Sequence, residues 1–222
     1  MKSKKHGLVI LLTTATLANC SNSKDSEIAT KAAIQSRIAA DSVELTSLVR
    51  NVYEWHETKY QNHGFPLKLN IPSDSLFVGI DWKAYNKDYE AFRKTNFFSD
   101  DFLARHRAIA MTIDSSIRQA GVEWRNAKDG IPLWSTDADD WCSCQDSPDN
   151  YWERLIISNF RFSKDAAAFN WGWGLKDGID PPFKYEMKAK KVNGAWRVSY
   201  MEGFKYYGTV ADYNKIMSRS KN

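Results

Sequence analysis

The sequence predicts an α+β fold in which N-terminal helices pack on a curved antiparallel sheet. Apolar residues recur at helical spacing in the first half of the chain, from Leu45 to Tyr60 and from Phe102 to Ile117. In the second half the spacing changes to an alternation, which is clearest in residues 183–192. Asn193-Gly194 is the strongest hairpin turn motif in the chain. Helices followed by an antiparallel meander are typical of the α+β class.

Residues 1–19 are predicted to be an export signal. Three lysines precede an apolar run from Leu8 to Ala18, which is too short for the roughly 20 residues that span a bilayer. Leu17-Ala18-Asn19-Cys20 resembles a bacterial lipobox, which implies cleavage before Cys20 and diacylation of its thiol. Ordinary signal peptidase cleavage after Ala18 and an uncleaved anchor are the two alternatives.

The chain that follows residue 19 is predicted to be a lipid-anchored protein of the bacterial cell envelope. Removing Lys2, Lys4 and Lys5 with the leader lowers the net charge from +4 to +1. A near-neutral chain carries no electrostatic footprint for nucleic acid. We expect a flexible tether over residues 20–27 and one domain over 28–222, which begins with a helical extension at 28–40.

The predicted helices are separated by recognisable boundary residues. Asp41 and Glu44 form a capping-box-like pair, so a second helix is expected to begin there and to end at Asn62-His63-Gly64. An irregular stretch follows to Gly79. A short helix is expected over 81–94, and Ser99 is the expected N-cap of the next. The last short helix is expected after Thr209, with Val210, Tyr213, Ile216 and Met217 on its apolar face.

The predicted strands are 152–162, 167–173, 183–192 and 195–201. Ile156 and Phe160 are expected to face the helices together with Tyr185 and Trp196. Trp171 and Trp173 lie two apart in one strand, so they share a face.

These aromatic residues are the predicted ligand-binding site. Trp171, Trp173, Tyr185 and Trp196 come from successive strands and are expected to form one wall. The wall is interpreted either as core packing or as a shelf for an apolar ligand. His106 lies on the apolar stripe of its helix and is either a group facing that pocket, even a general base, or a hydrogen-bonded core histidine. His56 has the same two interpretations.

The stretch "DWCSCQD" contains Cys142 and Cys144. A local loop disulfide, two unreactive thiols, a redox role and a metal role are all open. Alternating aspartates such as Asp137, Asp139 and Asp140 are weak candidates for a calcium site, but the glycine and bidentate glutamate of a calcium loop are missing. A solvated acidic loop is the alternative, and no cofactor is predicted.

Three segments resemble a family of uncharacterised exported bacterial proteins. They are "LVRNVYEWHETKY", "DGIPLWSTDADDW" and "VNGAWRVSYMEGF", and the resemblance covers residues 42–204. It implies the fold of nuclear transport factor 2 and ketosteroid isomerase, in which a curved sheet wraps on helices into a cone. It transfers no catalytic residue to this chain.

The resulting functional hypothesis is a non-enzymatic binding or accessory module with an apolar, aromatic pocket. Its partners would be the membrane, through lipid on Cys20, and a small apolar ligand, a peptide or an envelope protein. One alternative is a partner-blocking protein of the immunity type. The other is a small isomerase- or dehydratase-type enzyme, although no spacing identifies its acid or base.

Overall fold

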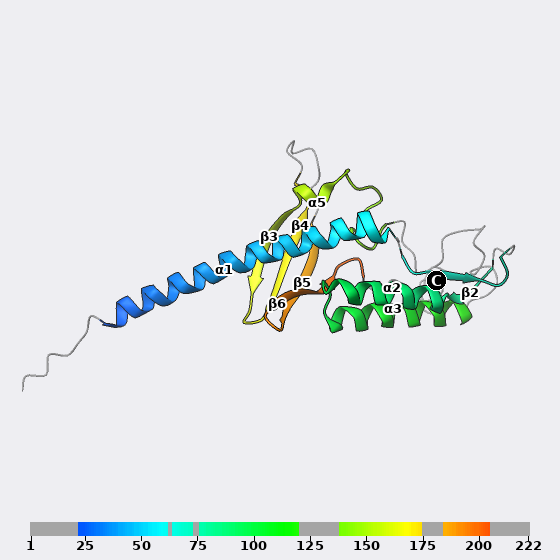
Figure 1. Ribbon diagram of the computed structural model, residues 1–222, viewed down its shortest axis with the longest axis horizontal. Helices are drawn as coiled ribbons and strands as arrows, with labels where there is room; N and C mark the ends of the chain where they lie inside the picture. Colours follow the sequence, from blue (N-terminus) through cyan, green and yellow to red (C-terminus); the bar gives the residue numbers. More distant parts are fainter. Residues whose placement is uncertain (1–21, 62–63, 73–75, 120–137, 175–183, 205–222) are drawn as a thin grey trace, which may run out of the picture. The chain divides into compact units, whose positions relative to one another are not determined.

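The computed structural model describes residues 22–61, 64–72, 76–119, 138–174 and 184–204. Cys20, Asp137 and the C-terminal helix expected after Thr209 lie outside these residues. The chain divides into two compact units, residues 1–39 and 40–222. The described part confirms the α+β class, with helices and two antiparallel sheets (Figure 1).

Helix α1 runs from Asn22 to Trp55 and continues as a π-helical turn, His56–Tyr60. It therefore includes the predicted tether residues 22–27 and the predicted boundary at Asp41. Asp41 is buried inside the helix because its carboxylate accepts hydrogen bonds from Lys191 Nζ at 2.6 Å and Trp196 Nε1 at 3.0 Å. The capping-box prediction was wrong, because α1 continues through Asp41 and the carboxylate binds side chains that lie 150 and 155 residues away.

The described residues of the first unit, 22–39, form the N-terminal part of α1. Side chains from Ser26 to Ala39 are exposed, except for the half-buried Ile38. Alanine, lysine and glutamine favour a helix intrinsically.

A two-stranded sheet replaces the irregular stretch expected before Gly79. Strand β1 (Leu67–Leu69) pairs antiparallel with β2 (Phe77–Ile80). The sheet is followed by α2 (Trp82–Thr95) and α3 (Asp100–Gln119), close to their predicted positions. Asp114 of α3 holds β2, because its Oδ1 accepts from the Ile80 N–H at 2.8 Å. Ser99 precedes α3 as expected, but its Oγ has no hydrogen-bond partner among the described residues.

The main sheet has the strand order β3-β4-β5-β6, with every neighbouring pair antiparallel. Its strands are Ile156–Phe162, Ala166–Gly172, Tyr185–Val192 and Ala195–Met201, and the short helix α5 (Tyr151–Arg154) precedes them. Asn193 and Gly194 have φ values of +53° and +82°. The predicted two-residue hairpin is therefore confirmed, because its turn type requires positive φ at both central residues.

Strand β3 faces the core differently from the prediction. Ile156 is 58% exposed, whereas Ile157 pairs with the buried Trp171 and lies on the inner face. The register shifts between Ser158 and Arg161, around Asn159 with φ of +55°. This bulge inserts a residue and reverses the alternation, which allows Phe160 to face inward as predicted while Ile156 does not.

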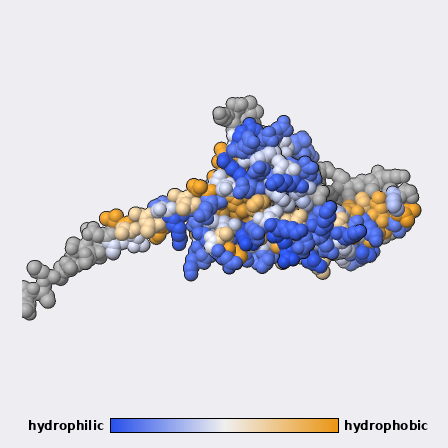
Figure 2. All heavy atoms as spheres, viewed as in Figure 1, coloured by the Kyte–Doolittle hydropathy of each residue, from blue (hydrophilic) through white to orange (hydrophobic). Residues whose placement is uncertain are grey.

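The core of the second unit lies between α1, the main sheet and the pair α2–α3. Four α1 side chains are completely buried: Leu45, Val49, Val52 and Tyr53. They share one cluster with sheet residues such as Phe169, Met187 and Val198. Figure 2 shows that hydrophilic side chains cover most of the visible face of this unit. Within the described ranges, no helix is both long enough and apolar enough to cross a membrane.

Candidate functional site

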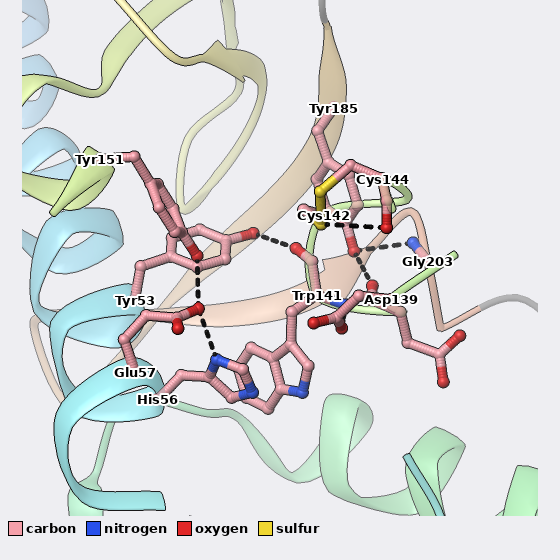
Figure 3. Close-up of a disulfide and its surroundings, with 11 residues drawn as sticks. Tyr53, His56, Glu57, Asp139, Trp141, Cys142, Cys144, Tyr151, Tyr185 and Gly203 are labelled. Atoms are coloured by element: carbon pink, nitrogen blue, oxygen red, sulfur yellow. Dashed lines mark hydrogen bonds and ion pairs between the residues drawn. A yellow bond between two sulfur atoms is a disulfide. The ribbon is translucent and has the colours of Figure 1, made fainter. Parts of the chain in front are cut away.

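The first candidate site is a turn over residues 138–144, which is closed by a disulfide between Cys142 and Cys144 (Figure 3). Asp139 organises the turn. Its N–H donates to the Cys144 carbonyl at 2.8 Å, and its own carbonyl accepts from the N–H groups of Cys142 and Ser143 at 3.2 and 2.6 Å. Its Oδ1 accepts from the Trp141 N–H at 2.8 Å. Four local hydrogen bonds of Asp139 therefore hold the backbone of this turn.

Two buried tyrosines fix the turn to the core. The Tyr53 hydroxyl of α1 donates to the Trp141 carbonyl at 2.7 Å. The Tyr185 hydroxyl of β5 donates to the Asp140 carbonyl at 2.7 Å and accepts from the Gly203 N–H at 2.7 Å. A Cβ atom at Gly203 would collide with the Asp140 carbonyl. Only glycine therefore allows the turn after β6 to approach residues 138–144 this closely.

The side chain of Trp141 packs in the aromatic core and so connects the turn to it. Its ring stacks on the buried His56, with centroids 3.9 Å apart and planes 28° from parallel. His56 Nδ1 lies 3.0 Å from Glu57 Oε1, and the Tyr151 hydroxyl donates to the same oxygen at 2.9 Å. The Glu57 side chain is 23% exposed, whereas His56 is not exposed at all. This geometry supports the interpretation of His56 as a hydrogen-bonded core histidine.

Burial sets the protonation of the groups around the turn. It raises the pKa of the Tyr53 hydroxyl well above its usual range, with further contributions from Tyr185 and Tyr151. Burial, followed by the nearby Glu57 carboxylate, likewise raises the pKa of Tyr151. Both hydroxyls are therefore neutral hydrogen-bond donors. Burial, followed by the charge of Asp139, raises the pKa of Asp140 to about 7, so this carboxyl titrates near neutrality.

The structure brings together three of the four residues of the predicted aromatic wall. Trp171 and Trp173 have ring centroids 4.9 Å apart, and Tyr185 lies 5.5 Å from Trp171. Trp171 and Trp173 are only 1% and 8% exposed. Tyr53 and Tyr151 lie directly against Trp171, at 4.7 and 5.9 Å. Side chains therefore fill the space in front of this part of the wall.

Trp196 lies elsewhere on the sheet. It pairs with Lys191, six residues along β5 from Tyr185, which corresponds to about 20 Å of strand. Its ring contacts Phe162 at 6.4 Å, and its Nε1 is bonded to Asp41. The four residues consequently do not form one continuous surface.

His106 belongs to another part of the core. Its ring lies among Phe65, Phe92 and Phe204, and its Nδ1 is 3.1 Å from the Tyr85 hydroxyl. Burial lowers the pKa of His106 to about 3, so the ring is neutral in the folded protein. These contacts match a hydrogen-bonded core histidine.

The bond between Cys142 and Cys144 confirms the interpretation as a local loop disulfide and excludes that of two unreactive thiols. Of the weak metal candidates, Asp139 uses its carboxylate inside the turn and Asp140 is largely desolvated. Among the residues that the structure describes, no group of three or more His, Cys, Asp or Glu side chains is arranged to hold a metal ion.

An open groove on α1 was not predicted. Its volume is about 400 Å³, and it is lined by Ser42, Val43, Thr46, Ser47, Arg50 and Asn51. Arg50 also donates to the Leu155 carbonyl at 3.1 Å, which connects this part of α1 to the start of β3. Sequence reasoning missed the groove because it followed the apolar stripe of the helix, and the lining residues lie beside that stripe.

Fold and site together define an α+β protein with a filled aromatic core, a disulfide-closed acidic turn and a polar groove. Comparisons with protein-family models, with curated proteins and with solved structures found no match. The fold class and the chemistry of these sites are therefore the basis for a functional assignment.

Proposed function

We propose that this chain is an exported, lipid-anchored protein that acts as a non-enzymatic binding module, and that its ligand is an extended peptide segment bound in the α1 groove. The observation that supports this choice is the contrast between the two candidate sites. The aromatic wall is filled by Tyr53 and Tyr151, whereas the α1 groove is open. The proposal thus keeps the binding role and moves the ligand from the wall to the groove.

The lining of the groove favours a peptide over an apolar small molecule. Sites for small molecules are mostly enclosed and apolar, whereas this groove is open and Val43 is the one apolar residue among the six described residues that line it. Serine and threonine hydroxyls both donate and accept hydrogen bonds, as does the amide of Asn51. These groups suit the alternating N–H and C=O groups of an extended backbone. The guanidinium of Arg50 adds a partner for a carboxylate.

Export is supported by the leader sequence and by the disulfide. Lipidation of Cys20 would follow from its lipobox-like context. A disulfide between Cys142 and Cys144 suits an oxidising compartment such as the periplasm or the cell surface. We further propose that the fold is the cone of the nuclear transport factor 2 class. The packing of α1 on a four-stranded antiparallel sheet is compatible with that fold.

The partner-blocking protein is the second candidate. Asp146 and Asp149 are exposed beside the disulfide-closed turn, and an acidic rigid turn would suit a basic partner surface. The enzyme alternative is less favoured, because His56 and His106 are both buried and hydrogen-bonded within the core.

A peptide selection tests the groove. A random dodecapeptide phage library would be selected on the soluble chain that follows Cys20, and enriched peptides would be measured by fluorescence anisotropy. Ser47→Trp places an indole in the groove, and we expect it to weaken binding at least tenfold. Glu54→Trp is the matched control, because Glu54 is exposed on the same helix but does not line the groove. Peptides that bind both variants as well as the parent would exclude the groove, and failure to enrich any peptide would count against the binding role.

Membrane anchoring is tested separately. We expect mass spectrometry of the protein from its bacterial host to show an N-terminal S-diacylglyceryl-Cys20. Cys20→Ala should leave the leader uncleaved or release the protein from membranes. Normal processing and membrane attachment of this variant would refute lipidation without affecting the groove.

A further inference from the structure

We propose that the Cys142–Cys144 disulfide is an exchangeable redox centre that oxidises external thiols and prefers cationic ones. This activity is independent of peptide binding in the α1 groove. It depends on three features of the turn over residues 138–144: the backbone does not need the disulfide, the two sulfurs differ in burial, and the surrounding charge is acidic.

The turn is held without its covalent bond. Asp139 makes four hydrogen bonds within it, and the hydroxyls of Tyr53 and Tyr185 bind two of its carbonyls. The stacking of Trp141 on His56 adds a contact in the core. None of these interactions involves a sulfur atom, so all of them persist when the disulfide is reduced.

The loop that the disulfide closes is also very short. The two cysteines are two positions apart, so the bond encloses three residues. By the chain-entropy relation, a loop this short gains far less stability from its cross-link than a long loop does. Reduction therefore leaves the protein folded, and the bond can open and close as a reversible local event.

The difference in burial selects the sulfur that is attacked. Cys142 is only 3% exposed, whereas Cys144 is half-buried. An external thiolate attacks Cys144 Sγ, forms a mixed disulfide and releases the Cys142 thiolate, which takes a proton from water. A second external thiolate then attacks the external sulfur of the mixed disulfide and releases Cys144. Two thiols are oxidised to one disulfide, and Cys142 and Cys144 take up the two electrons.

The surrounding charge selects the kind of thiol. Between residues 138 and 150 the chain carries the carboxylates of Asp139, Asp146 and Asp149 and no lysine or arginine. The Glu57 carboxylate lies 3.0 Å from His56, on which Trp141 of the turn stacks, and it accepts a hydrogen bond from Tyr151. The nearest described cation on the flanking segment is Arg154, which donates to the Asp149 carbonyl at 3.3 Å. A negatively charged thiol is therefore repelled, and a thiol that carries an ammonium group, or lies in a basic peptide, is attracted.

The test compares cationic cysteamine with anionic 2-mercaptoethanesulfonate. Reduction of the native protein would be followed at low ionic strength by alkylation and intact mass, with rates expressed per thiolate. The double variant D146N/D149N is the control, because it keeps the disulfide and removes two negative charges. The intrinsic reactivity of each thiol is the same toward both proteins, so it drops out when their rate ratios are compared. We expect the ratio of the cysteamine rate to the mercaptoethanesulfonate rate to be at least threefold higher for the parent than for the variant. Half-molar salt should abolish this difference.

Two further measurements make the outcome decisive. Far-UV circular dichroism of the reduced protein should match that of the oxidised protein. In the single variants, Cys144 in C142S should react with a thiol reagent at least tenfold faster than Cys142 in C144S. The proposal is overturned if reduction proceeds only at the rate of global unfolding, if the reduced protein is unfolded, or if the charge preference is the same in the parent and the double variant.

Discussion

Replacement of Asp41 tests a contact that the sequence did not predict, between α1 and the β5–β6 hairpin. Asp41→Ala removes a buried carboxylate that accepts from Lys191 Nζ and from Trp196 Nε1. The indole N–H is then left buried without a partner, which costs about 1–3 kcal/mol. The Lys191 side chain is 25% exposed and can turn toward water, so the full penalty of about 3–5 kcal/mol for a broken buried pair does not apply. We expect a loss of about 2–3 kcal/mol in the free energy of unfolding.

Urea unfolding of the chain that follows Cys20, monitored by circular dichroism, measures this loss. Glu44→Ala is the matched control, because Glu44 is exposed three residues along the same helix. It should change stability by less than about 0.5 kcal/mol. A double-mutant cycle with Lys191→Met separates the ion pair from the indole hydrogen bond. An Asp41→Ala variant that is as stable as the control would show that Asp41 is not buried between α1 and the β5–β6 hairpin.

Three other changes test the sheet, the core and the acidic turn. Gly194→Val should destabilise the protein by about 1 kcal/mol or more, because a β-branched residue resists the φ of +82° found there; an unchanged melting temperature would contradict the hairpin turn. Trp173→Ala should lower the free energy of unfolding by about 3–4 kcal/mol, the scale of a large core truncation, and the parent should bind no apolar fluorescent probe. If the parent does bind the probe, and Trp173→Ala abolishes this binding without loss of stability, the aromatic wall is a ligand shelf after all. The folded-state pKa of Asp140, about 7, lies above the usual aspartate value of 3.8, so between these two pH values the folded state retains a proton that the unfolded state has lost. Its contribution to stability should therefore be complete below about pH 4 and should fall as the pH rises to about 7, by about 1–2 kcal/mol after allowance for solvent screening. Asp140→Asn should remove this part of the pH profile, and an identical profile in the variant would place the carboxyl in water.

Local patterns predicted the fold class and the hairpin because both depend on neighbouring residues. The alternation in residues 183–192 and the Asn193-Gly194 turn are encoded within a few positions, and the structure confirms both. Helices α2 and α3 were placed for the same reason, since their apolar stripes and boundary residues are local.

Predictions failed where a distant partner or an inserted residue decides the structure. The sequence predicts a helix boundary at Asp41, whereas Lys191 and Trp196 bind its carboxylate within α1. The bulge around Asn159 reversed the faces of β3, which simple alternation cannot anticipate. The tyrosines that fix the turn over residues 138–144 act across 88 and 45 positions. The local disulfide was one of four interpretations that the sequence left open, and the spacing of two cysteines could not reveal these partners.

The contacts of α1 also determine when this helix can be buried during synthesis. Asp41 and Trp196 are 155 positions apart, and a ribosome adds about 5–20 residues per second. The apolar stripe of α1 is therefore made about 8–30 seconds before the strand that covers one end of it. The β5–β6 hairpin can pair as soon as both strands exist, whereas α1 must wait for it. The helix that is synthesised first completes its packing last, and in a nascent chain that stops before Ala195 the end of α1 near Asp41 is still without its contact to Trp196.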